Sequence, residues 1–189
     1  MSDKKKKPGS GKSKGSGFER EVASKLSLWF SEGERDDIFY RSHSSGGRFT
    51  MRGKTKKDTA YQSGDITCSD PCGKGLIDKW SIECKTGYGN WGVLDLLDSN
   101  QKITQLEQFF KQCQEDAMKC CKHPILIFRR PQRKICICID KDYFLYLENL
   151  FGKYSDYLIS IKPMNLMIVK FEEFLEWTDP SQFKDTLCL

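Results

Sequence analysis

Three charged residues, Asp65, Glu83 and Lys85, have types and a spacing that could form a catalytic site. Glu83 and Lys85 are two positions apart in residues 80–85, whose alternation predicts a β-strand with both side chains on one face. If residues 63–68 form the preceding antiparallel strand, Asp65 lies beside them. Carboxylate oxygens are the ligands that Mg²⁺ prefers, and this ion usually takes only one or two of them from protein. The pattern therefore predicts a magnesium site with a lysine next to it.

The pair Gly64-Asp65, followed by Glu83-x-Lys85, resembles the motif of the PD-(D/E)xK nuclease superfamily. Within that superfamily, it is most similar to the archaeal-type Holliday junction resolvases. One position departs from the family pattern, because Gly64 stands where the name-giving proline would be. An isolated Glu-x-Lys triplet would carry no information, so the resemblance depends on the elements around it.

Two further segments resemble the same family and occur in its order. Residues 17–22 resemble its first helix, in which a glutamate, here Glu19, opens the active site. Residues 41–44 resemble the end of a strand that carries serines. This sequence also has an insertion between Ser45 and Asp65, where loops could contact DNA differently.

The resemblance implies an α/β (α+β) fold with a restriction-endonuclease-like core, in which a mixed β-sheet is flanked by helices. This nuclease core is expected over residues 17–140, and residues 141–189 are expected to be a C-terminal α/β extension of the same domain. The implied activity is an endonuclease that hydrolyses phosphodiester bonds of DNA. By analogy the substrate is branched DNA, a four-way junction, and the enzyme is a homodimer. An apolar dimer surface could come from Trp91, Leu94, Leu96 and Leu97.

The chemistry of phosphodiester hydrolysis suggests a role for each residue of the site. Asp65 and Glu83 would hold one or two Mg²⁺ ions, for which Mn²⁺ could substitute, with the backbone carbonyl of Cys84 as a further ligand. Glu19 could serve a second metal or its water shell. Lys85 would orient the attacking water or stabilise the developing negative charge. The other interpretation of Glu19 is that it completes a helix capping box with Ser16.

The net charge of +5 comes from the first sixteen residues, which contain six lysines and one aspartate, while the rest of the chain is balanced. Residues 1–16 have no hydrophobic pattern and are expected to be a disordered tail. Residues 41–57 and 119–134 are basic without acidic residues between, which favours contact with a polyanion over a merely solvated loop. The DNA-contact candidates are Arg41, Ser42, Ser44, Arg48, Arg52, Lys54, Lys56, Lys57 and Gln105.

Hydrophobic periodicity indicates the elements that must position the site. Apolar residues at helical spacing predict a helix from Ser16 to about residue 32, and strands are expected over residues 37–42, around Asp65 and around Ser81. Residues 69–75 have the composition of a turn between the last two. A long helix over residues 99–121 would turn Ile103, Leu106, Phe110, Cys113 and Ala117 inward, followed by strands over residues 125–129 and 134–140.

Nine cysteines, an odd number, lie mostly in apolar patterns and indicate a reducing intracellular compartment, the cytoplasm or nucleoid, or the nucleus in a eukaryote. A structural zinc site at Cys68, Cys72, Cys120 and Cys121 is not expected, because the ligand spacing is incomplete. No segment is long and apolar enough for a membrane span or secretory signal. His43 is a possible general base that the chemistry does not need.

Two other functions remain open at this point. One is a restriction-like or recombination and repair nuclease with the same core that acts on linear duplex or ends. The other is a DNA-binding protein without catalysis, which the combination of Asp65, Glu83 and Lys85 argues against, since binding alone does not require carboxylates placed together.

Overall fold

The computed structural model describes residues 11–42, 63–89, 92, 94–98, 100 and 104–184, with side chains from residue 14 onward. Several residues singled out in the sequence lie outside these ranges: the lysine tail up to residue 10, His43, the DNA-contact candidates from Ser44 to Lys57, and Trp91 and Ile103.

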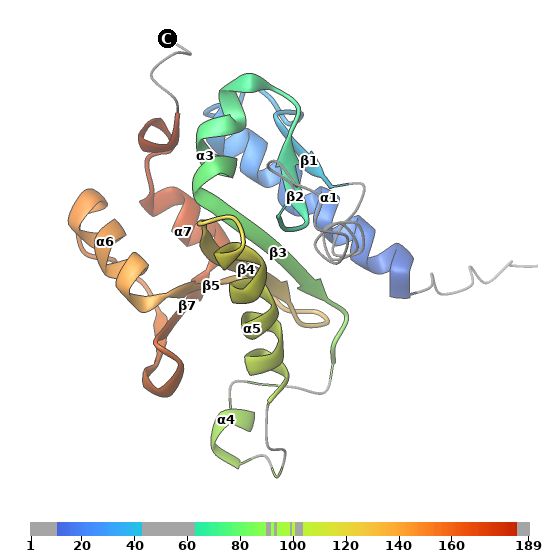
Figure 1. Cartoon of the computed structure of the whole chain (residues 1–189), viewed down its shortest axis with the longest axis vertical. Coiled ribbons are helices and arrows are strands. Elements are labelled where there is room, and N and C mark those ends of the chain that lie inside the picture. The colour runs from blue at the N-terminus through green and yellow to red at the C-terminus, as the bar shows by residue number, and fades with distance from the viewer. Residues whose placement is uncertain are drawn as a thin grey trace, which may run out of the picture.

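A five-stranded mixed sheet forms the centre of the fold, in the order β3-β4-β5-β7-β6 (Figure 1). The strands β3 and β4 are parallel, and the other neighbours are antiparallel. The expected mixed sheet flanked by helices is therefore confirmed. The bounds are β3 (Trp80–Thr86), β4 (His123–Arg129), β5 (Ile135–Asp140), β6 (Leu158–Ile161) and β7 (Leu166–Lys170).

Helices cover both faces of this sheet, so strand residues alternate between two apolar cores. On one face, α1 (Gly11–Phe30), α6 (Lys141–Phe151) and α7 (Phe171–Trp177) pack against the sheet. On the other face, α5 (Gln105–Met118) buries Leu106, Phe110 and Cys113 against Leu126 and Phe128. Alternation along β3 sends Ile82 and Cys84 to the α1 face, which leaves Glu83 and Lys85 for the α5 face.

The helix α1 starts earlier than the sequence pattern indicates. It runs from Gly11, so Ser16 lies inside the helix and cannot be its N-cap. The expected start at Ser16 is wrong, as is the expectation of an irregular segment over residues 11–16. Once the apolar face of α1 is docked, each added residue gains a backbone hydrogen bond without a new nucleation step, which offsets the weak helix propensity of Gly11, Ser13 and Gly15.

The strand near Asp65 belongs to a separate two-stranded ribbon and not to the main sheet. In this ribbon β1 (Phe39–Arg41) pairs antiparallel with β2 (Ile66–Cys68). The link to β3 is one isolated parallel bridge between Gly64 and Ile82, so the expected antiparallel pairing of residues 63–68 with β3 is wrong. Two strands that run in the same direction need a crossover between them.

The crossover consists of the 3₁₀ helix η1 (Pro71–Gly73) and the short helix α3 (Lys74–Lys79), where a plain turn was expected. Leu76 and Ile77 of α3 are fully buried in the core that contains α1. Turn-forming residues begin the crossover, but the burial of Leu76 and Ile77 stabilises a helix in the rest of it.

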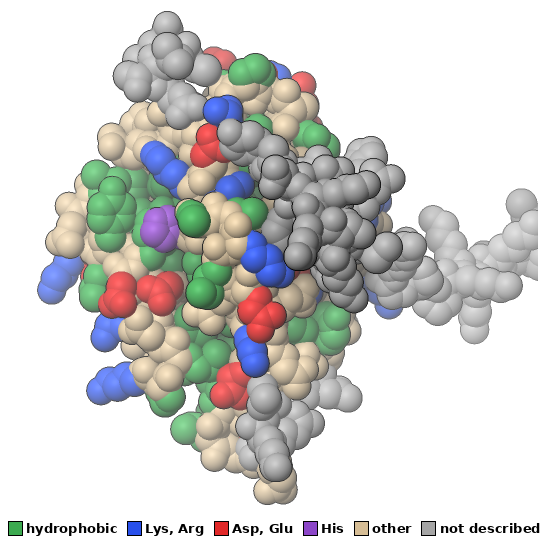
Figure 2. Space-filling view, in the orientation of Figure 1, with side chains coloured by type: hydrophobic (Ala, Val, Ile, Leu, Met, Phe, Trp, Pro, Cys, Tyr) green, Lys and Arg blue, Asp and Glu red, His purple; other side chains and the backbone are tan. Residues whose placement is uncertain are grey.

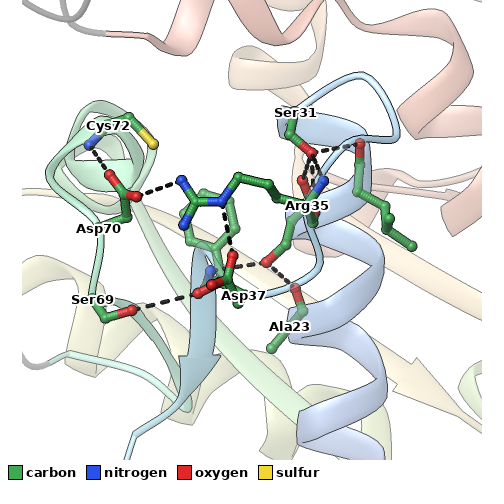
Figure 3. Close-up of polar contacts among 10 residues, drawn as sticks. Ala23, Ser31, Arg35, Asp37, Ser69, Asp70 and Cys72 are labelled. Carbon is green, nitrogen blue, oxygen red and sulfur yellow. Dashed lines mark hydrogen bonds and ion pairs between the residues drawn. The ribbon is translucent and has the colours of Figure 1, made fainter.

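Polar contacts tie this ribbon and crossover to the end of α1 (Figure 3). The Arg35 guanidinium bridges two carboxylates, with Nε 2.9 Å from Asp37 Oδ1 and Nη1 2.6 Å from Asp70 Oδ2. The backbone N–H of Cys72 and the Arg35 charge lower the pKa of Asp70 to about 2. At the other side, the Ser27 hydroxyl donates to Ala23 O and accepts from the Phe39 N–H. The ribbon is thereby held in a fixed place against α1.

The last part of the chain contributes to the sheet itself. The strand β7 lies between β5 and β6, and the short helix η3 (Pro180–Phe183) places Phe183 against Trp80 at 4.9 Å between ring centroids. Within the described ranges the eight cysteines are all free. None of the helices described here combines the length and hydrophobicity needed to cross a membrane.

Candidate active site

The candidate site lies at the edge strand β3, where two charged side chains share the α5 face. Lys85 Nζ is 2.5 Å from Glu83 Oε1, and the two side chains are 17% and 7% exposed. Lys85 also lies over the ring of Phe109, 5.7 Å from its centroid, and Tyr88 meets the same ring edge-on at 4.7 Å. The ion pair is therefore largely sheltered from water, which strengthens its electrostatic interaction.

Asp65 reaches this pair from the ribbon and is fixed by three hydrogen bonds. Its N–H donates to Ile82 O at 2.7 Å, and its carbonyl accepts from the Ser42 N–H at 2.7 Å. Its carboxylate Oδ2 accepts from the Cys84 N–H at 2.9 Å. In a strand the N–H and C=O of one residue point to the same edge, so the Cys84 carbonyl also faces the free edge of β3.

Gly64 makes this close approach possible. Its φ is +87°, and a Cβ at this position would lie 2.5 Å from Ile82 O and 2.8 Å from Ile82 N. Proline cannot adopt this conformation, because its ring holds φ near −65°. The departure from the family motif at this position is thus required by the backbone path that brings Asp65 against β3.

Replacing Gly64 with alanine is expected to destabilise the fold and to displace Asp65. The substitution combines a left-handed φ with a backbone clash, so we expect a loss of about 2–4 kcal/mol in the free energy of unfolding. The matched control is Gly33→Ala, because Gly33 has φ +93° with nothing near its missing Cβ. Urea unfolding of the two variants measures the difference, and equal losses would contradict the role of the close approach.

Glu19 enters the site from α1. Its side chain is 11% exposed, and Oε2 forms an ion pair with Nε of Arg41 on β1. The capping-box interpretation of Glu19 fails, because its partner Ser16 lies within the helix. Glu19 is also close enough to Asp65 to raise the pKa of that carboxyl group.

Burial and mutual repulsion perturb the carboxylates. Burial first, and then the charge of Glu83, raise the pKa of Asp65 to about 7. Burial also raises the pKa of Glu83. Burial alone would lower the pKa of Lys85, but the Glu83 carboxylate outweighs it and raises that pKa. Buried carboxylates with such perturbed pKa values mark a candidate functional site, and a cation bound between them would offset their repulsion.

The donor set fits a magnesium-sized ion. Among the residues that the structure describes, no three His, Cys, Asp or Glu side chains converge as a metal cage. Two carboxylates, Asp65 and Glu83, together with the outward-facing Cys84 carbonyl, match an ion that keeps most of its positions for water and phosphate. Cys68, Cys72, Cys120 and Cys121 form no disulfide with the other described cysteines.

The raised pKa of Asp65 predicts how stability depends on pH. Between the unfolded value near 3.8 and the folded value of about 7, the folded state binds more protons than the unfolded state, so stability falls as pH rises. Each unit of pKa difference corresponds to about 1.4 kcal/mol. We expect urea unfolding in EDTA to show this loss between pH 5 and pH 8, and Mg²⁺ to reverse it at pH 8.

Asp65→Asn is the control for this measurement, because it removes the titrating group while other groups continue to titrate. The pH dependence of the wild type minus that of the variant isolates Asp65. A difference that is flat from pH 5 to pH 8 would contradict the assigned pKa.

Gln112 on α5 is part of the site and was not identified from the sequence. Its Nε2 donates to Glu83 Oε1 at 3.2 Å. Gln105, the expected candidate, is the first residue of α5, after the capping residue Thr104. Gln105 and Gln112 are seven residues apart, about two helical turns, so they lie on the same side of the helix. They belong to a stripe of glutamines that also includes Gln101 and Gln108 in the sequence. The stripe was visible in the sequence, but which member faces β3 depends on how α5 docks.

Two DNA-contact candidates have partners within the chain. Arg41 pairs with Glu19, and Ser42 is buried, with its N–H on the Asp65 carbonyl. In this structure both residues position the acidic groups of the site. The remaining candidates between Ser44 and Lys57 lie outside the described residues.

Comparison with known families shows which family this chain matches. The model of a family described as Phage putative PDDEXK endonuclease matches residues 10–185. The matched region includes Glu19, Asp65, Glu83 and Lys85, and it continues past Asp140 through the C-terminal strands. No curated protein and no solved structure matches the chain.

Proposed function

We propose that the chain, which belongs to this family of phage PDDEXK endonucleases, hydrolyses phosphodiester bonds of DNA with a divalent metal ion at Asp65 and Glu83. One observation carries the proposal. Two buried carboxylates, each with a raised pKa, meet at the free edge of β3 beside a lysine that stays protonated. Burial disfavours the ionised form of both carboxylates, and a bound cation would offset that cost, whereas DNA binding alone gives no reason to place two carboxylates together.

The metal ion, Mg²⁺ or Mn²⁺, would be held by Asp65, Glu83 and the Cys84 carbonyl, and would supply Lewis-acid chemistry, acidifying a water and neutralising phosphate oxygens. The chain's own groups prepare the site for it. The Cys84 N–H orients the Asp65 carboxylate, and the Gln112 amide orients that of Glu83. The ion pair with Arg41 holds the Glu19 carboxylate on the α1 side of the site.

Lys85 acts as a cation in this proposal. Because its pKa is raised by Glu83, it remains protonated at neutral pH and cannot serve as a general base. Its ammonium group, fixed 2.5 Å from Glu83 Oε1, would instead stabilise the negative charge that develops on the phosphate and would orient the attacking water.

A finer proposal concerns the substrate and the oligomeric state. We infer a preference for branched DNA and a homodimer with two sites, as the resemblance to junction resolvases implies. One exposed apolar surface supports the dimer. Leu94, just before the short helix α4 (Asp95–Asp98), is 68% exposed, and Leu97, on that helix, is 85% exposed. Together with Leu96 and Ile159 they line an apolar groove of about 460 Å³ beside β6.

The experiment is cleavage of a labelled four-way junction and of a linear duplex with the same arm sequence, in Mg²⁺ and in EDTA, with Asp65→Ala as control. Symmetric nicks near the branch point, absent from the duplex, would support the finer proposal. Equal cutting of both substrates would limit the function to a general endonuclease. Metal-independent cleavage, or binding without cleavage, would contradict the proposed function.

A further inference from the structure

We propose that a basic pocket beside the candidate site binds a backbone phosphate of the DNA strand, next to the phosphate that is cleaved. This inference rests on the proposed function and specifies how the substrate is held. The pocket has a volume of about 550 Å³ and lies between the start of α1 and the turn that joins β4 to β5. Its lining includes Lys14, Thr86, Arg129, Arg130 and Arg133.

The charge of this pocket is one-sided. Among the described residues, no acidic side chain lines it, and of its four basic side chains only Arg129 has an acidic partner, Glu21, at 2.8 Å. Lys14, Arg130 and Arg133 form no ion pair or hydrogen bond through their side chains with other described residues. Unopposed guanidinium groups are well suited to phosphate, because each presents several donors in a planar fork.

The register of the sheet explains why this basic turn lies at the site. The strands β3 and β4 are parallel, with Thr86 opposite Arg129, so both strands end at the same place. The basic run of residues 119–134 is thereby divided by β4. The residues before β4, among them Lys119, lie at the far end of the strand, where Lys119 pairs with Asp116. Of this run, the residues that line the pocket are those at the end of β4 and in the turn after it, Arg129 to Arg133.

The pocket adjoins the site residues through their sequence neighbours. Thr86 follows Lys85 directly, and the lining residues Gly17 and Phe18 come just before Glu19. Because side chains alternate along β3, Thr86 points to the opposite face from Lys85. A DNA strand that crosses the end of β3 would therefore place one phosphate at Lys85 and a neighbouring phosphate in the pocket.

The outer face of α5 offers a phosphate less. Its exposed charged residues, Lys111, Glu115 and the C-capping Lys119, are of both signs. Acidic and basic side chains are also mixed on the face of the molecule that Figure 2 shows. In contrast, the glycines of the pocket leave room for a close approach, since a Cβ at Gly17 or Gly87 would meet nothing within 4 Å.

The test compares DNA binding by wild type, by Arg130→Ala/Arg133→Ala, and by the control Lys141→Ala/Lys153→Ala. The control removes the same charge at the first residue of α6 and just past its last residue, away from the pocket and from the apolar groove beside β6. Binding is measured by fluorescence anisotropy in EDTA over a range of salt concentrations. We expect the pocket variant to bind about 10-fold more weakly and its salt dependence to decrease by roughly 0.9 in log–log slope for each phosphate that it no longer neutralises. The control should change by less than about 2-fold.

A second measurement locates the phosphate. Single phosphates near the cut are replaced one at a time by neutral methylphosphonates. The wild type should bind DNA more weakly when one particular phosphate beside the cut is neutral. The pocket variant should bind that modified DNA as well as it binds unmodified DNA, because the arginines that contact this phosphate have already been removed. Arg130→Lys/Arg133→Lys, which keeps the charge, should recover most of the affinity, while thermal melting shows that all variants are folded.

The outcomes separate this inference from the proposed function. If wild type binds and cuts DNA but the pocket variant matches the control, the pocket inference is wrong and the nuclease proposal stands. The inference is also overturned if the methylphosphonate effects are the same in wild type and in the pocket variant. If wild type neither binds nor cuts DNA, both proposals fail.

Discussion

Asp65→Asn is expected to abolish cleavage and, at the same time, to stabilise the metal-free protein at pH 8. Cleavage should fall by about three orders of magnitude or more, because the variant loses a carboxylate that would hold the metal. Stability should rise because burial and the nearby charges of Glu83 and Glu19 disfavour the ionised Asp65, whereas asparagine carries no charge. The asparagine carbonyl can still accept the hydrogen bond from the Cys84 N–H.

The measurements are single-turnover cleavage in Mg²⁺ and urea unfolding in EDTA, both at pH 8. Asp36→Asn, at an exposed position between α1 and β1, is the matched control and should change neither quantity appreciably. A variant at Asp65 that cuts DNA at the wild-type rate would show that the site has been assigned to the wrong residues.

Lys85→Met is expected to slow the cleavage step by about 10²–10³-fold while leaving DNA affinity within about 3-fold of wild type. The methionine retains much of the apolar stem of lysine but removes the cation that faces the phosphate. It also leaves the Glu83 carboxylate buried without its partner, which should lower the free energy of unfolding by about 1–3 kcal/mol at pH 8.

Lys85→Arg provides the matched comparison for this prediction. It keeps the positive charge next to Glu83, so stability should return to near the wild-type value. Activity should recover only in part, because a guanidinium differs from an ammonium in shape and position. If Lys85→Met weakens binding as strongly as it slows cleavage, the lysine contributes to substrate affinity and not to the chemical step.

The face of β3 that carries the site could be predicted from the sequence because it depends on local alternation. Glu83 and Lys85 share a face in any strand, and the apolar positions of α5 are fixed by helical spacing. Leu106, Phe110, Cys113 and Ala117 are buried as their periodicity indicates.

Other features of the site depend on contacts between distant parts of the chain. The parallel bridge at Gly64 is set by the crossover through α3, whose burial is a property of the assembled core. Gln112 was hidden among similar glutamines, since sequence spacing cannot tell which helical turn meets Glu83. The partner of Arg41 was also not predictable, because Glu19 comes from a different element.

The ribbon of β1 and β2 carries Asp65, whereas Glu83 belongs to the main sheet, and in the described structure the ribbon meets β3 through a single backbone bridge. The two carboxylates thus belong to separate parts of the fold, and they repel each other when both are ionised. A cation shared between them would act as a cross-link, so that loading the site and locking the ribbon onto the sheet become one thermodynamic event. The metal would thus stabilise the contact between β3 and a ribbon that α1 already holds in place.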